Sequence, residues 1–530
     1  MQRRTFLQWS AAGAATLLLP RVASAAKKFS VIDASVADLQ GALTSGRLTA
    51  VKLTELYLAR IAAYDRRGPK INSIIELNPE ALVVAAASDA ARRAGNVVGP
   101  LHGIPVLIKD NIATADKMST SAGSLALANV PATRDAFLVA QLRKAGAIIL
   151  GKTNLSEWAN IRSSHSTSGW SSRGGLTKNP YALDRNTSGS SSGSAAAVTA
   201  SFAALAVGTE TDGSITSPAS LHGLVGVKPT LGLISRNGVV PIAHSQDTAG
   251  PMTRTVADAA VLLNALVGDD ARDAVTKGVA AKTPDFVKAL NAAGLRNTRL
   301  GVVRNFIGGH DGVTALFDAA RKVLVAQGAT LVECDIPNTD KYSDTELEVL
   351  LYELKADLNA YLAEFAPTAS VKTLADIIAY NQTNRARVMP YFGQELFIQA
   401  QAKAGLDSKA YLDALATNHR YARQEGIDKV LREANVTALI APTSGPAWLT
   451  DLVNGDSFGM SFTTPAAVAG YPHVTVPMGA VAGLPVGLSF VGTAFTDATM
   501  LRYAYAYEQA SKLRRAPNFR TTAGDAAGLH

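Results

Sequence analysis

The chain has 530 residues, of which 47% are apolar and 18% charged, so it can bury a large core. The net charge of +8 is spread without any block of Lys or Arg longer than a pair, which excludes a nucleic-acid partner. The single cysteine, Cys334, excludes an internal disulfide, and no apolar run after the N-terminus reaches the ~20 residues that a membrane span requires.

The first 25 residues predict an export signal. Arg3 and Arg4 precede an Ala- and Leu-rich run over 9–19, and Ala23-Ser24-Ala25 is typical of a cleavage site. Paired arginines followed by Phe-Leu indicate a twin-arginine signal, with an ordinary Sec signal or an uncleaved anchor as alternatives. We expect cleavage after residue 25 and a soluble mature chain, 26–530, that is periplasmic or secreted.

Helices and strands alternate in the first third of the mature chain. Helices are predicted between Thr49 and Gly68 and between Asn78 and Gly95. The apolar run Val106–Ile108 predicts a strand covered on both faces. A helix over Thr133–Ala145 and a strand over Ala147–Leu150 follow, so this part predicts the strand-helix-strand unit of an α/β fold.

From about residue 280 to about residue 435 the sequence predicts mainly helices, and this region is more charged than the part before it. We expect this region to form an insertion or cap against the sheet and to determine substrate specificity. Strand character returns over Thr437–Pro442, Val474–Met478 and Leu488–Val491, and a helix closes the chain over Thr496–Ala510. Because strands come from both ends of the chain, they must share one sheet, which predicts a single domain.

Two lysines stand at the ends of predicted buried strands. Lys109 follows Val106–Ile108, and Lys152 follows Ile148–Gly151. Burial disfavours a charged ammonium and lowers the pKa of a lysine, and a neutral amine is a general base. Both lysines qualify on these grounds, and either could also turn to solvent at the end of its strand.

The most unusual stretch is TSGSSSGSAAAVTA, from Thr187 to Ala200. A phosphate-binding loop would need Gly-Lys-Ser/Thr where the chain has Gly193-Ser194-Ala195. A flexible linker is possible, although apolar segments flank the stretch without a shift in composition. A nucleophile elbow around Ser191 fits the G-x-S-x-G pattern but needs a preceding strand, and residues 179–186 are turn-like.

Three separate motifs resemble the amidase signature family of Ser-Ser-Lys amide hydrolases. They are GIPVLIKDN with Lys109, GSSSGSAAAV with Ser190, and GTETDGSI with Ser214, which stands 24 residues after Ser190. The resemblance continues through four further segments and spans most of the mature chain: 223–241, 245–260, 466–479 and 483–492. It implies a large central mixed and twisted β-sheet covered by helices on both faces, in a single domain over 26–530.

The resemblance also implies a role for each motif residue. Ser214 would be the nucleophile. The resemblance selects Lys109, and not Lys152, as the neutral base. Ser190, held by a cis peptide bond, would relay the proton between them. The backbone N–H groups of Thr211, Asp212, Gly213 and Ser214 would form the oxyanion hole. No metal or cofactor enters this scheme, and the eight histidines show no ligand spacing such as H-x-x-x-H.

Four positions depart from the usual family pattern. Glu210, Asp212 and Thr216 stand where many members have Asp, Gly and Arg, and Ser192 replaces a glycine. The sequence Glu210-Thr211-Asp212, together with Ser192, resembles that of the bacterial peptide amidases in particular. We expect the Asp212 side chain to face away from the oxyanion donors and to support the loop.

The function expected from the resemblance is an exported serine amidase that hydrolyses C-terminal carboxamides of peptides and releases ammonia. Alternatives with the same machinery are an acylamidase and a lactam or oligoamide hydrolase, and one of another class is a catalytically silent binding protein. The glutamine-hydrolysing subunit of a tRNA-dependent amidotransferase is disfavoured by the export signal. The elbow hypothesis instead makes Ser191 and a late histidine, His473, essential. We expect a small or short peptide amide as substrate, and a monomer or homodimer.

Overall fold

One sheet of eleven strands organises the fold, and its neighbouring strands run in the order β1-β3-β2-β6-β8-β7-β12-β13-β11-β9-β10. The computed structural model describes residues 29–524, so the predicted signal segment lies outside the described residues. The strands are β1 (Ile74–Leu77), β2 (Pro105–Lys109), β3 (Ile148–Thr153), β6 (Leu205–Glu210), β7 (Val225–Lys228), β8 (Thr248–Thr253), β9 (Arg299–Val303), β10 (Thr330–Cys334), β11 (Ala438–Pro442), β12 (His473–Val481) and β13 (Leu484–Val491). A separate small hairpin joins β4 (Trp170–Ser171) and β5 (Gly175–Leu176).

The sheet is mixed, as expected. Strands β3, β2 and β6 run parallel to one another, β8 pairs antiparallel with β6 and β7, and β9 pairs parallel with β10 and β11. The central strands β2, β3, β6, β7 and β8 are buried along their whole length, which explains their nearly continuous apolar sequences.

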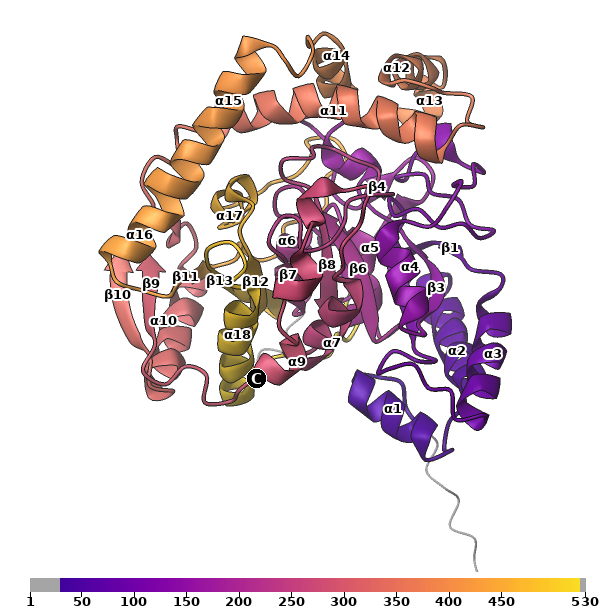
Figure 1. The fold of residues 1–530 in the computed structure, drawn as a ribbon, viewed down its shortest axis with the longest axis horizontal. Coiled ribbons are helices and arrows are strands. Elements are labelled where there is room, and N and C mark those ends of the chain that lie inside the picture. Colours follow the sequence, from indigo (N-terminus) through magenta and orange to yellow (C-terminus); the bar gives the residue numbers. More distant parts are fainter. Residues whose placement is uncertain (1–28, 525–530) are drawn as a thin grey trace, which may run out of the picture. The chain divides into compact units, whose positions relative to one another are not determined.

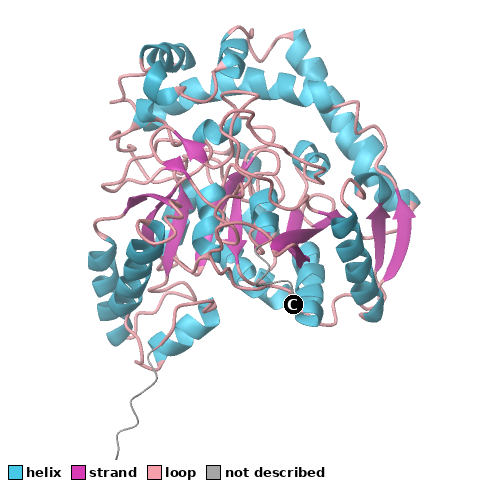
Figure 2. Ribbon diagram, turned by 180° about the vertical axis from the view of Figure 1, so that it is seen from behind, coloured by secondary structure: helices cyan, strands magenta, loops and turns pink. Residues whose placement is uncertain are grey.

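Helices cover both faces of the sheet (Figures 1 and 2), in agreement with the predicted α/β single domain. One set of helices that pack against the sheet contains α4, α7, α10 and α18. A second set contains α5 and α6. The helices are α1 (Val36–Thr44), α2 (Ala50–Arg60), α3 (Ala81–Arg93), α4 (Phe137–Lys144), α5 (Ser192–Thr199), α6 (Thr216–Leu221), α7 (Val256–Leu266), α8 (Val279–Lys282), α9 (Phe286–Ala289), α10 (Asp311–Ala326), α11 (Ser343–Phe365), α12 (Leu374–Thr383), α13 (Arg385–Val388), α14 (Glu395–Gln401), α15 (Lys409–His419), α16 (Asp428–Glu433), α17 (Thr464–Ala469) and α18 (Asp497–Ser511). None of the helices within 29–524 is long and apolar enough to cross a membrane.

The region predicted as helical, 280–435, is helical only in part. It contributes β9 and β10, which form one edge of the sheet, before the long helix α11 begins. Helices α11, α14 and α15 pack together at the top of Figure 1 and form the cap of the fold. The prediction missed the two strands because both are short and follow helical segments, and the edge strand β10, which is half exposed, carries a weak apolar pattern.

Candidate active site

Lys109 lies at the end of β2, in the middle of the sheet, and its side chain is completely buried. Its amine Nζ lies 2.7 Å from Ser190 Oγ, 2.8 Å from Thr209 Oγ1 and 3.2 Å from the carbonyl oxygen of Thr209. Thr209 belongs to β6, the strand beside β2, so the sheet itself fixes these contacts. A neutral amine has two N–H groups, which Thr209 can accept, and one lone pair, which then faces the Ser190 hydroxyl.

Burial lowers the pKa of Lys109 to about 7, against the opposing attraction of Asp247 and Glu210. An ordinary lysine is fully charged at neutral pH, whereas this amine is neutral in a large fraction of molecules. Lys109 therefore has both the position and the protonation state of a general base.

Ser190 stands in the Gly/Ser loop, and the peptide bond between Gly189 and Ser190 is cis, as the resemblance implies. The loop is closely packed, since a Cβ on Gly189 would lie 2.2 Å from Ser156 Oγ. The next residue, Ser191, donates its backbone N–H to the carbonyl oxygen of Ser214 over 3.1 Å. This bond places the Gly/Ser loop directly beside the predicted nucleophile.

Ser214 lies on the turn before α6 and lines a cleft of about 510 Å³. Gly213 has a φ of +73°, a left-handed conformation that favours glycine, and it turns the chain at this point. Within the part of the chain that the structure describes, no acceptor takes a hydrogen bond from the backbone N–H groups of Thr211, Asp212, Gly213 or Ser214. The last three of these residues line the cleft, so their N–H groups are available to bind an oxyanion.

Glu210 and Thr216, two departures from the family pattern, interact with each other. The Glu210 carboxylate accepts hydrogen bonds from the backbone N–H groups of Ile215 and Thr216, over 2.8 and 2.9 Å, and from the Thr216 hydroxyl. Lys228, also buried, lies near enough to attract this carboxylate, and burial lowers the pKa of Lys228 to about 8. The pair fixes the turn that carries Ser214.

Asp212 supports the same turn, as expected. Its carboxylate accepts a hydrogen bond from Thr464 Oγ1 over 2.6 Å, yet Asp212 is also one of the residues that line the cleft. Burial raises the pKa of Asp212, and its neighbour Glu346 has a raised pKa for the same reason and through repulsion by Asp212. The neutral form that burial favours removes the repulsion that a carboxylate would exert on an oxyanion.

Three residues that the motifs did not single out complete the surroundings of the site. Thr209 holds the Lys109 amine, Asp247 accepts a hydrogen bond from the Thr211 hydroxyl over 2.5 Å, and the Gln246 amide reaches the Thr211 carbonyl over 3.3 Å. Burial raises the pKa of Asp247 to about 6. Gln246 and Asp247 lie in the matched segment 245–260, so a signal was present in the sequence, but only the fold shows what they touch.

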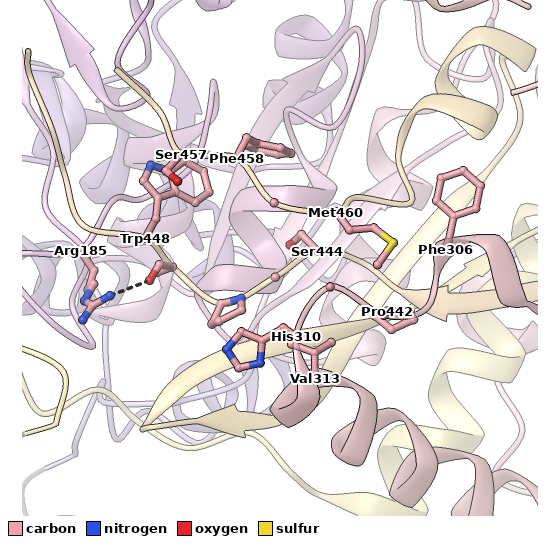
Figure 3. A pocket seen from close by; sticks show the side chains of 16 residues that line it. Arg185, Phe306, His310, Val313, Pro442, Ser444, Trp448, Ser457, Phe458 and Met460 are labelled. Carbon is pink, nitrogen blue, oxygen red and sulfur yellow. Dashed lines mark hydrogen bonds between the residues drawn. The ribbon is translucent and has the colours of Figure 1, made fainter. Parts of the chain in front are cut away.

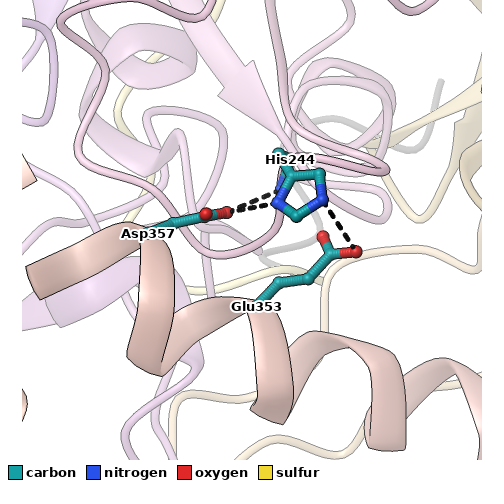
Figure 4. A group of neighbouring side chains, drawn as sticks. All are labelled: His244, Glu353 and Asp357. Atoms are coloured by element: carbon teal, nitrogen blue, oxygen red, sulfur yellow. Dashed lines mark hydrogen bonds and ion pairs between the residues drawn. The ribbon is translucent and has the colours of Figure 1, made fainter. Parts of the chain in front are cut away.

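The loop before Gln246 is attached to the cap by a cluster of three side chains (Figure 4). His244 Nδ1 lies 2.8 Å from the Asp357 carboxylate, and His244 Nε2 lies 3.4 Å from that of Glu353, both on α11. These residues are the one group among 29–524 with the composition and spacing to hold a metal ion. The hydrogen bond to Asp357 raises the pKa of His244, so the two carboxylates favour the imidazolium form of this side chain.

The elbow hypothesis finds no support in the geometry. No strand precedes Ser191 directly, because β5 ends at Leu176 and the chain from there to α5 is irregular. Ser191 Oγ donates to the carbonyl oxygen of Thr209, which belongs to β6. His473 Nε2 lies 2.6 Å from Ser489 Oγ, and these two residues belong to β12 and β13. The structure therefore separates the two residues that this hypothesis requires together.

Known proteins resemble this chain over nearly its whole length. The sequence model of the Amidase family matches residues 52–501. An Arabidopsis thaliana protein named as a probable amidase is 41% identical over 503 residues, which cover 93% of this chain and 92% of that protein. The native peptide amidase of Stenotrophomonas maltophilia is 49% identical with a TM-score of 0.87, covering 92% of this chain and 98% of that one. An amidase family protein of Bacillus anthracis is 39% identical with a TM-score of 0.84, covering 92% and 93%.

These similarities extend over the sheet, the Gly/Ser loop and the turn that carries Ser214, so they include every part of the candidate site. The chain is an amide-hydrolysing enzyme and belongs to the amidase family, the amidase signature family that its three motifs resemble.

Proposed function

We propose that this amidase hydrolyses the C-terminal carboxamides of peptides and releases ammonia, with Ser214, Ser190 and Lys109 as its catalytic residues. The observation that carries the proposal is the contact of 2.7 Å between the buried Lys109 amine and the Ser190 hydroxyl, in a loop bonded to the backbone of Ser214. The 49% identity to a protein described as a peptide amidase supports the substrate class.

The first half of the reaction forms an acyl-enzyme. Neutral Lys109 accepts the proton of the Ser190 hydroxyl, and Ser190 in turn accepts the proton of Ser214. Ser214 Oγ attacks the amide carbon, and the N–H groups of Asp212, Gly213 and Ser214 bind the oxyanion that forms, each donor contributing ~3 to 4 kcal/mol. Return of the proton along the same path protonates the nitrogen, which leaves as ammonia while Ser214 keeps the acyl group as an ester.

The second half repeats these steps with water. A water molecule takes the place vacated by ammonia, gives its proton through Ser190 to Lys109 and attacks the ester carbon. Collapse of the oxyanion releases the peptide as a free acid and restores the Ser214 hydroxyl. The base thus acts twice in each turnover, and no group outside the three side chains and the oxyanion donors is required.

The lining of the cleft favours a peptide as the substrate. Beside Ser214 it carries many hydroxyl and amide groups, among them Asn160, Ser163, Ser168 and Thr463. Such groups can donate to and accept from the backbone of a peptide, whereas a long aliphatic amide could form none of these hydrogen bonds along its chain. An acylamidase or a lactam or oligoamide hydrolase would use the same three residues on a different acyl group.

We also propose that the chain is exported through its twin-arginine segment and acts in the periplasm or outside the cell. Support comes from the sequence of residues 1–25 alone. Expression of the full chain with Arg3 and Arg4 both replaced by Lys should retain the enzyme in the cytoplasm with an unprocessed N-terminus. Export of that variant at the wild-type level would contradict the twin-arginine assignment.

The proposed activity is tested by ammonia release from N-acetylated dipeptide amides. Ser214→Ala, Ser190→Ala and Lys109→Ala should each abolish turnover, while the matched controls Ser191→Ala and His473→Ala should retain it. Amine release from aryl anilides, measured beside it, distinguishes an acylamidase. A wild-type enzyme that cleaves anilides but no peptide amide would disprove the proposed substrate.

A further inference from the structure

A second cavity, of about 270 Å³, is shown in Figure 3 and shares Phe458 with the cleft that contains Ser214. Its walls come from four parts of the chain: Arg185, the segment between β9 and the start of α10, the segment after β11 and the residues 457–460. Small-molecule sites occupy ~300 to 1,000 Å³, and the volume of this cavity lies just below that range. It can therefore hold one large side chain but not a whole peptide.

The segment 456–461, which we call the partition, separates the two cavities. Each of its residues lines at least one of them. Asp456 and Ser461 line the cleft at Ser214, Ser457 and Met460 line the second cavity, and Phe458 lines both. The Phe458 side chain is 50% exposed, which is unusual for a phenylalanine and leaves its ring available at the junction. The second cavity therefore adjoins the cleft in which the amide would bind, and Phe458 stands in the wall of both.

The partition is firmly anchored on the cleft side. The Asp456 carboxylate accepts hydrogen bonds from the backbone N–H of Ser168 over 3.0 Å and from the Asn186 amide over 3.1 Å. Asn186 in turn belongs to the chain that leads into the Gly/Ser loop, and its Oδ1 accepts from the N–H of Ser188. The position of the second cavity relative to the catalytic loop is fixed by these bonds.

Aromatic groups dominate the second cavity. The rings of Trp448 and Phe458 meet edge to face, with centroids 5.2 Å apart and planes at 66°, and Phe306 and Met460 stand opposite them in Figure 3. Aromatic rings and a thioether sulfur favour contact with a further ring. At one end the Arg185 guanidinium donates to the Ala447 carbonyl oxygen, so a polar tip could also be received there.

We propose that this cavity is a specificity subsite that binds an aromatic side chain of the substrate peptide, on the acyl side of the amide that Ser214 attacks. The proposal deepens the proposed function and depends on it. It assigns the choice of peptide to the partition segment and the loop after β11, and not to the helical cap alone.

The test measures kcat/KM for ammonia release from two series, acetyl-X-NH2 and acetyl-X-Gly-NH2, in which X is Gly, Leu, Phe or Tyr. Phe and Tyr should exceed Gly by about tenfold or more in one of the two series, and Leu should be intermediate. Turnover of any of these amides decides the proposed function, and the ratio of Phe to Gly decides the subsite. Absence of turnover throughout would overturn both, whereas equal rates for all four residues would overturn the subsite only.

Filling the cavity provides the second arm. A Cβ on Gly445 or on Gly459 would meet no atom within 4 Å, and neither glycine has a positive φ, so the backbone and the Cβ position accept Gly445→Leu and Gly459→Leu. Both line the cavity, and each should lower the Phe-to-Gly ratio by about tenfold. Gly41→Leu, at an equally open position on α1, is the matched control and should keep the ratio. A ratio that survives both cavity-filling variants would show that the aromatic side chain binds elsewhere.

Discussion

Lys109 and Lys152 occupy nearly equivalent places in this fold, and only one of them has a contact suited to catalysis. They lie at the ends of the neighbouring parallel strands β2 and β3, and both side chains are completely buried. Burial lowers the pKa of both, to about 7 for Lys109 and about 8 for Lys152. Desolvation at the end of a strand is therefore common to the two lysines and does not distinguish a base from a structural residue.

The partners of the two amines differ. Lys109 Nζ faces the hydroxyl of Ser190, in the loop beside the cleft. Lys152 Nζ instead donates to the Ile112 carbonyl oxygen over 2.5 Å and to Thr120 Oγ1 over 2.9 Å, and Asp110 is the nearest acid that opposes the fall of its pKa. The Lys109 amine can take a proton from a hydroxyl near the cleft. The Lys152 amine instead links two segments of the chain, at Ile112 and at Thr120.

The largest effect is expected from Lys109→Met. The variant keeps the volume of the side chain but has no base, so kcat/KM for a peptide amide should fall by about 10³ to 10⁴. Steady-state ammonia release measures the loss, and circular dichroism checks the fold. An activity within tenfold of wild type would mean that another group accepts the proton, and Lys152 would be the first to examine.

A pH profile of the wild-type enzyme tests the same amine without a mutation. Protonation of Lys109 removes the lone pair that faces Ser190, so activity should fall as the pH drops below the pKa of about 7, by ~10-fold per pH unit. A plateau is expected above pH 8, and the loss between this plateau and pH 5 is then about 10²-fold. Because kcat/KM reports the free enzyme, this is the parameter to follow; a profile flat from pH 5 to 8 would be inconsistent with a neutral Lys109.

Within the sequence, only the family resemblance distinguished Lys109 from Lys152, because the local patterns of the two lysines are alike. Lys109, Ser190 and Ser214 each stand in a local motif, and the apolar runs before the lysines predict buried strands. Which amine meets the Ser190 hydroxyl depends on the order and register of strands far apart in the chain, and no local pattern encodes it. Thr209 was missed for the same reason, since it reaches Lys109 only because β6 pairs with β2.

The two cavities extend this point to specificity. Residues that form the partition, 456–461, lie in an irregular segment with no periodicity, and the sequence therefore directed attention to the helical cap instead. Their significance depends on which face of the segment meets Ser214, and this is a tertiary property. Likewise His244 and its two acids on α11 are more than a hundred residues apart, so no ligand spacing could have predicted their contact.

An intermediate effect is expected from Thr209→Val, which replaces the hydroxyl that bonds Lys109 Nζ by a methyl group of similar size. Thr209 acts through the lysine, so it is a positioning residue, and its loss should lower kcat by about tenfold. The readout that separates positioning from folding is the pH profile, because a changed environment of the amine shifts its midpoint from about 7. Thr209→Ser, which keeps the hydroxyl, should restore both values; equal losses in the two variants would point to packing alone.

The smallest effect on activity is expected from Lys152→Met, the counterpart of the first variant. This substitution leaves the Ile112 carbonyl and the Thr120 hydroxyl without their buried donor, which should lower the free energy of unfolding by about 1 to 3 kcal/mol. The contacts of Lys109 with Ser190 and Thr209 do not involve Lys152, so kcat/KM of the folded enzyme should stay within about threefold of wild type. Denaturant unfolding gives the first quantity and peptide-amide hydrolysis below the unfolding range gives the second. If Lys152→Met lost activity to the same degree as Lys109→Met while remaining folded, the partner of each amine would not be what decides its role.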